Sequence, residues 1–258
     1  MEQSQPPFSA GQGFCSSCGQ RIQANDRFCP SCGTAIGTVR TSRPASIEPV
    51  YLDFEGTGLQ ALGWGVLAFF LSILVIPAGW GLAAVTRWFV ANIRSSDGTE
   101  AQFGGSGGQI WWYFPLLVFV TIPLSFIPFV GSILALLFAS WIYLRIFRWF
   151  FEEIRQSNGV RLEFTGGYWP FLGWYLLSAI SIYSIIGWAW VWAAWMRWMC
   201  RNISMGRKRV VFEGNGWDFL WRGILVLLGS IPIITYPWMA VWFTRWLIRN
   251  VVIQPVEA

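Results

Sequence analysis

The chain has 258 residues, of which 55 % are hydrophobic and only 12 % are charged, and it contains 19 tryptophans. Soluble proteins carry roughly 25 % charged residues, so this composition indicates a membrane protein. The net charge of +5 is too small an excess to favour nucleic acid, and we expect no nucleic-acid partner. The chain has no histidine, which excludes imidazole acid-base chemistry and histidine metal ligands.

Two Cys-x-x-Cys pairs lie near the amino terminus, Cys15 with Cys18 and Cys29 with Cys32, and a glycine follows each pair. Four thiolates complete a tetrahedral zinc site and leave no open position for a catalytic water. Residues 14–34 resemble the small zinc ribbons at the ends of many bacterial proteins, which predicts one structural Zn²⁺ ion. Two disulfides are the alternative, but a reducing cytoplasm disfavours them. The ribbon would either only stabilise its own small fold or also dock a partner protein.

The segments on either side of the predicted ribbon have no hydrophobic periodicity. Residues 1–13 are polar and contain no apolar core, so we expect a disordered tail and no cleavable signal peptide. Residues 35–49 are rich in Ser, Thr and Pro, which predicts a flexible linker.

A pattern that recurs four times after residue 49 divides the rest of the chain into segments 50–97, 98–158, 159–207 and 208–258. In each segment a Phe-x-Gly turn is followed by an apolar run, then by a Trp seven residues before an Arg-Trp pair, and then by Asn or Glu. The first Trp is Trp80, Trp141, Trp190 or Trp238; the Arg is Arg87, Arg148, Arg197 or Arg245; the last residue is Asn92, Glu153, Asn202 or Asn250.

Each segment begins with a short period-two alternation, as in Val50, Leu52 and Phe54, which predicts a strand. An apolar run of helical length, a break with Pro or Gly, and the Trp/Arg helix follow. The predicted fold is therefore an α-helical membrane protein with four pseudo-repeats of a strand and a helical hairpin, or about eight embedded helices, after a zinc ribbon. Because spanning takes about 20 apolar residues and several runs are shorter, half-inserted hairpins are the alternative.

Charged residues are absent from 56–86, 101–144, 164–196 and 223–244, so they cluster where the segments join. Basic residues beside apolar spans face the cytoplasm, and we therefore expect both termini on that side.

The four arginines allow two interpretations. They would converge on an anion or lipid-phosphate site, because an intramembrane arginine is costly and its guanidinium suits phosphate. Alternatively, each would extend along its helix to the headgroups, with its tryptophan at the interface. We recognise no nucleophile with a base and no carboxylate pair, so we expect no enzyme.

From Phe54 to Phe103 most clearly, the pattern F-x-G-x-G, apolar run and W-x6-R-W-x3-N resembles the YjgN-like family of bacterial inner-membrane proteins, whose function is unknown. The resemblance implies a multi-pass protein of the bacterial inner membrane. We expect a non-enzymatic protein whose ribbon docks a cytoplasmic partner and whose body senses or organises lipid. The alternative is a transporter or channel for an anionic solute that uses the four arginines.

Overall fold

The structure is a computed structural model, and it describes residues 12–14, 18, 20–23, 31–32 and 49–255, without 185 and 207. The chain divides into two compact units, Met1–Ser46 and Ile47–Ala258. In the first unit, β1 (Gln12–Phe14) pairs antiparallel with β2 (Arg21–Gln23), so that Phe14 lies opposite Arg21. The predicted tail and linker, residues 1–13 and 35–49, fall almost wholly outside the described residues.

The second unit consists of helical hairpins that are each preceded and followed by a strand. The first segment holds β3 (Val50–Phe54), α1 (Gly58–Ile73), α2 (Ala78–Ala91) and β4 (Ile93–Ser95). The second holds β5 (Ala101–Phe103), α3 (Gly107–Ile110), α4 (Tyr113–Ser125), α5 (Val130–Glu152) and β6 (Ile154–Gln156). The third holds β7 (Glu163–Phe164), α6 (Tyr168–Ser181), α7 (Gly187–Arg201) and β8 (Ile203–Met205). The fourth holds β9 (Lys208–Phe212), α8 (Gly216–Gly229), the 3-10 helix η1 (Ile233–Thr235), α9 (Tyr236–Arg249) and β10 (Val251–Pro255).

The strands form a curled antiparallel sheet. Six strands pair in the order β4-β3-β10-β9-β8-β7, and β5 pairs separately with β6. A bridge between Arg155 and Arg161 connects the two-stranded sheet to the strand β7 region. The last strand, β10, pairs with β3, the first strand of the second unit, and Val252 lies opposite Tyr51.

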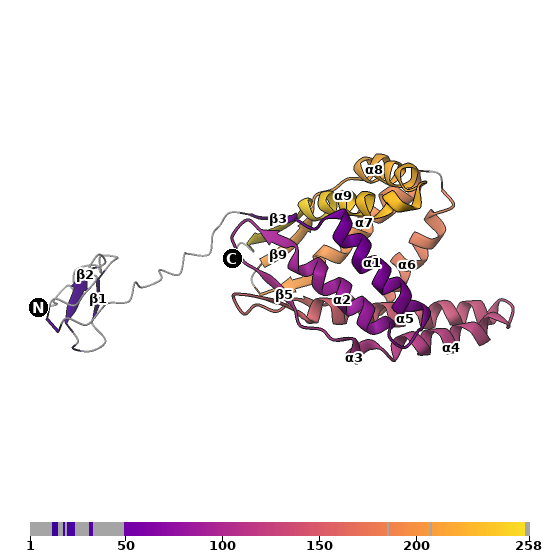
Figure 1. Cartoon of the computed structure of the whole chain (residues 1–258), viewed down its shortest axis with the longest axis horizontal. Helices are drawn as coiled ribbons and strands as arrows, with labels where there is room; N and C mark the ends of the chain where they lie inside the picture. Colours follow the sequence, from indigo (N-terminus) through magenta and orange to yellow (C-terminus); the bar gives the residue numbers. More distant parts are fainter. Residues whose placement is uncertain are drawn as a thin grey trace, which may run out of the picture. The chain divides into compact units, whose positions relative to one another are not determined.

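The helices follow the same order around the sheet. The second helix of each hairpin packs on the first helix or strand of the next segment, and α9 packs on α1, which closes the arrangement. In Figure 1 the strands gather at one end of this unit and the hairpins extend away from them. The core lies between the two layers, where Phe54, Phe103, Phe164 and Phe212 are buried.

Local sequence explains where the helices begin and end. Thr57 accepts a hydrogen bond from the backbone of Gln60, and the Gln60 side chain accepts one from Thr57, which is a capping box. Ser106 and Gln109 form a second capping box at α3. Proline begins or interrupts the later helices, because it lacks a backbone donor: Pro77 precedes α2, and Pro237 lies in the first turn of α9.

The predicted fold class, an α-helical membrane protein with about eight embedded helices, is wrong. Among the described residues, only Gly107–Ser125 and Val130–Glu152 are long and apolar enough to cross a membrane. Helices α2, α6, α8 and α9 have 14 residues each, short of the roughly 20 that a crossing takes. The strands also form an extended curled sheet with a second strand in each segment, whereas the prediction had one short strand per segment. The composition indicated a large apolar surface, but it did not show that most of the helices are too short to cross a bilayer.

Candidate functional site

The first candidate site is the cysteine-bearing hairpin of the first unit. Phe14 of β1 lies opposite Arg21 of β2, and Cys18 lies between these two strands in the sequence. Cys18 and Cys32 are exposed. The other two predicted ligands, Cys15 and Cys29, lie outside the described residues.

Each of the four predicted arginines donates a hydrogen bond to the Phe-x-Gly turn of the following segment. The Nη2 atoms of Arg87, Arg148 and Arg197 lie 3.1, 2.9 and 3.4 Å from the carbonyl oxygens of Gly105, Gly166 and Gly214. Arg245 donates back to the first segment, from Nη2 to Gly56 at 3.3 Å and from Nε to Phe54 at 3.0 Å. The arginines therefore join neighbouring segments in a closed series.

Each arginine makes this contact at a different turn. None of the four lines either of two apolar pockets found among the described residues. Arg87 is exposed and the other three are half-buried. The anion or lipid-phosphate role of the arginines stays a prediction.

The first tryptophan of the signature fits against a glycine of the next segment. A Cβ atom at Gly107 would lie 2.5 Å from Trp80, one at Gly216 would lie 2.7 Å from Trp190, and one at Gly58 would lie 2.5 Å from Trp238. In the third segment Tyr168 replaces this glycine, and its hydroxyl donates to the carbonyl oxygen of Leu137 at 3.0 Å. Trp141, in the second segment, lies instead under the guanidinium of Arg145, whose Cζ is 5.3 Å from the centre of the ring.

The last residues of the signature close the helix ends. The Nδ2 atoms of Asn92, Asn202 and Asn250 each donate, at 2.7 Å, to the carbonyl oxygen four residues earlier. Glu153 instead accepts a hydrogen bond from Nε2 of Gln109 at 2.8 Å. The side-chain oxygen of Gln109 accepts from Nε1 of Trp149, also at 2.8 Å.

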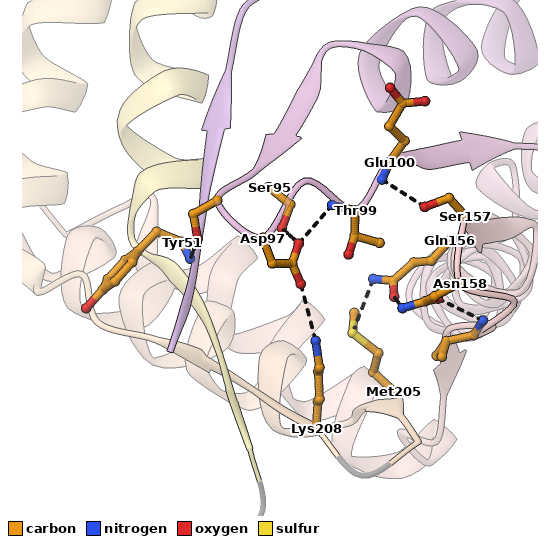
Figure 2. A network of polar contacts seen from close by, with 12 residues as sticks. Tyr51, Ser95, Asp97, Thr99, Glu100, Gln156, Ser157, Asn158, Met205 and Lys208 are labelled. Atoms are coloured by element: carbon orange, nitrogen blue, oxygen red, sulfur yellow. Dashed lines mark hydrogen bonds and ion pairs between the residues drawn. The ribbon is translucent and has the colours of Figure 1, made fainter. Parts of the chain in front are cut away.

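The turns between the strands carry a polar network (Figure 2). Nζ of Lys208 lies 3.4 Å from a carboxylate oxygen of Asp97, which connects the first and fourth segments. Asp97 also accepts hydrogen bonds from the hydroxyl of Ser95 at 2.6 Å and from the backbone of Thr99 at 2.9 Å. Burial opposes the ionisation of Asp97, but these hydrogen bonds and the charge of Lys208 outweigh it and lower the pKa of Asp97 to about 2.

The opposite ends of the hairpins carry large apolar side chains that are exposed. At the four turns, Leu74, Phe126, Tyr183 and Ile233 are 65, 81, 91 and 86 % exposed. Their neighbours in the same turns are exposed as well: Phe69, Phe70, Ile73, Ile76, Ile127, Phe129, Val130, Ile180, Ile182, Ile186, Ile231, Ile234 and Tyr236. We call this set the apolar turns.

Comparison with known proteins decides the nature of the first unit. Residues 14–36 match the model of a zinc-ribbon domain. The chain carries a zinc ribbon. The match covers both cysteine pairs and extends the predicted range, 14–34, by two residues. The donor set suits Zn²⁺, since two thiolate pairs supply the four ligands of a structural site. No curated protein and no solved structure matches the chain.

Two features of the second unit were missed from sequence. The carbonyl oxygens of Gly56, Gly105, Gly166 and Gly214 are the partners of the arginines. Phe-x-Gly and Trp/Arg were both recognised as recurring, and this joint recurrence was the signal for a contact between them. The apolar turns were missed because exposure depends on the packing of the hairpins, which periodicity alone does not show.

Proposed function

We propose that the protein is a non-enzymatic membrane protein that holds its zinc ribbon at the cytoplasmic face of a bacterial inner membrane for docking of a partner. The apolar turns are the single observation that carries this proposal. Soluble proteins rarely expose large apolar side chains in groups of this kind, and such groups mark membrane or protein contacts. Here four turns, distant in sequence, expose it at the same end of their hairpins.

The two candidate spans of the second segment, α3 with α4 and then α5, favour a bilayer over a protein partner as the environment of these turns. Only 11 % of the apolar window of Gly107–Ser125 and 22 % of that of Val130–Glu152 is buried inside the protein. The core helix of a soluble protein would be mostly buried. In our proposal this hairpin crosses the bilayer, and the three shorter hairpins enter it from the cytoplasmic side without crossing.

Polar groups near the turns are compatible with lipid. The hydroxyls of Ser125 and Ser184 donate to backbone carbonyl oxygens of Ile122 and Ser181, each at 2.6 Å. A hydroxyl that is satisfied by a backbone carbonyl a few residues earlier costs less to transfer from water. At the other end of the unit lie the ion pairs Arg94–Glu55 and Arg249–Asp53, both at 2.9 Å. This separation of charge from apolar surface suits a protein whose strands stay in water.

The resemblance to the YjgN-like family supports the same location. Basic residues at the strand end, such as Arg155 and Arg201, would face the cytoplasm together with the ribbon. Lipid would then be a direct partner of the body, and a cytoplasmic protein the partner of the ribbon.

The proposal is tested by flotation of the full chain with phospholipid vesicles after an alkaline wash, which removes peripheral proteins. We expect the protein to float. A charge in the middle of α4, Phe119→Asp, should reduce insertion, because it costs about 3 kcal/mol at the bilayer centre. Phe119 is 75 % exposed, so the substitution leaves the core intact. Ser157→Asp, at an exposed strand turn, is the matched control and should float normally. A monodisperse wild-type protein in water without detergent would overturn the proposal.

A further inference from the structure

A partly open apolar chamber of about 290 Å³ lies between the strands and the ends of the second helices. It is separate from the apolar turns. In the first segment its wall is formed by Leu52, Phe89, Val90, Ile93 and Ser95. The residues at the corresponding positions of the other three segments, together with Thr99 and Met196, complete it. Among its described lining residues none is charged.

The size of this chamber is unusual for a protein interior. Interiors have few voids larger than a water molecule, because each void forfeits packing contacts. The chamber has roughly twice the volume of an apolar cavity of 150 Å³ that stays dry and binds benzene. It is therefore large enough for a ligand of roughly ten non-hydrogen atoms, and an apolar occupant would restore the missing contacts.

The wall shows what kind of occupant fits. Met196, Met199 and Met205 line one side, and their unbranched side chains adapt to flexible apolar ligands. Polar side chains occur chiefly at the strand-turn side, in Ser95, Thr99 and Gln156. Figure 2 shows these residues beside the Asp97–Lys208 ion pair, and Gln156 donates from Nε2 to Sδ of Met205 at 3.4 Å. Because Asp97 and Lys208 neutralise one another, this rim does not select a charged head group.

We infer that the chamber binds one unbranched aliphatic chain of a lipid, with its head group at the rim formed by Ser95, Thr99 and Gln156. This aliphatic chain would belong either to a free single-chain lipid or to a phospholipid of the bilayer. This inference does not depend on whether the apolar turns enter a membrane.

Cys200 provides the readout, because it lines the chamber and is buried. The delipidated full chain in an amphipathic polymer, free of alkyl detergent, is treated with N-ethylmaleimide with and without 1-decanol. The modified Cys200 peptide is quantified by mass spectrometry, so the ribbon thiols do not interfere. At ten times its half-saturating concentration, 1-decanol should slow the modification of Cys200 about tenfold. An unchanged rate would overturn the inference, and so would a Cys200 that does not react in the folded protein without 1-decanol.

A second experiment distinguishes the two sources of the aliphatic chain. In phospholipid discs, a phospholipid occupant would protect Cys200 before 1-decanol is added, whereas a free lipid would protect it only afterwards. Ala101→Phe fills the chamber from β5 and should abolish the effect of 1-decanol, while Ala91→Phe, on an exposed position of α2, should retain it. Equal protection of the wild type and the folded Ala101→Phe variant would place 1-decanol outside the chamber and overturn the inference.

Discussion

Arg245, near the end of the chain, donates a hydrogen bond of 3.0 Å from Nε to the carbonyl oxygen of Phe54 in the first strand of the second unit. Its Nη2 donates to Gly56 as well, at 3.3 Å. Phe54 and Arg245 are separated by 191 positions, so this contact closes the series of segments. The other three arginines connect consecutive segments through one carbonyl each.

We expect Arg245→Met to destabilise the second unit more than Arg87→Met does. Arg245 is half-buried and binds two carbonyl groups, whereas Arg87 is exposed and binds one. Hydrogen bonds from charged donors contribute about 2 kcal/mol each when they are shielded from water. Urea unfolding followed by tryptophan fluorescence measures the difference. An equal, small loss of unfolding free energy in both variants would show that the contacts of Arg245 stabilise the unit no more than the contact of Arg87 does.

The contact between Gly58 and Trp238 predicts opposite effects for two substitutions in α1. Gly58→Ala should destabilise the protein, because the new Cβ would lie 2.5 Å from the ring of Trp238. Gly63→Ala meets nothing within 4 Å, so it should stabilise α1 by up to about 1 kcal/mol through helix propensity. Thermal unfolding of the two variants tests this pair, and a stabilising Gly58→Ala would contradict the packing.

Asp97 predicts a pH-dependent difference in stability. Since the pKa of Asp97 is lowered to about 2 in the folded protein, its stabilising contribution is complete above the unfolded value of 3.8 and is lost as the pH falls toward 2. Asp97→Asn should therefore cost about 1 kcal/mol between pH 5 and 7, with the difference shrinking below about pH 4. Denaturant unfolding of both proteins at several pH values measures this.

The control for Asp97→Asn is Glu100→Gln. The carboxylate of Glu100 points away from the network in Figure 2, and Glu100 enters it through its backbone donor to Ser157. We expect almost no change in stability from this substitution. A difference between wild type and Asp97→Asn that stays constant down to pH 2 would mean that ionisation of Asp97 is not its cause.

Removal of zinc should unfold the ribbon and leave the second unit unchanged. A structural zinc contributes the folding free energy of a domain too small for its own core. The purified chain should contain one zinc, which Cys18→Ser and Cys32→Ser lose and Cys200→Ser keeps. All 19 tryptophans lie after residue 50, so their fluorescence should not respond to a chelator. Zinc retained by both ribbon variants would contradict the ligand assignment.

The sequence predicted individual elements better than their assembly. The alternation of Val50, Leu52 and Phe54 lies in β3, and the apolar run after it lies in α1. The strands that follow the helices were missed, because three residues such as Ile93–Ser95 are too few for an alternation to be recognised. The pairing of β10 with β3 joins the two ends of the unit, and no local pattern specifies so distant a partner.

The zinc ribbon was the site most accessible from sequence, since four cysteines at fixed spacing have few other uses. The arginines were harder, because an arginine in an apolar helix suits a ligand, a headgroup or a carbonyl equally well. Arg148, for example, donates to Gly166 across a segment boundary, and only the placement of α5 against the β7 region brings the two together.

The most direct test of the account is a map of lipid contacts, made with the full chain in vesicles whose phospholipids carry a photoactivatable diazirine in mid-chain. Cross-linked peptides identified by mass spectrometry should come from α4 and α5 and from the other three apolar turns, around Leu74, Tyr183 and Ile233. Strand residues that do not line the chamber, such as Asp53 and Arg209, should remain unlabelled. Labelling of these two residues, or no labelling at the three shorter turns, would contradict the proposed insertion.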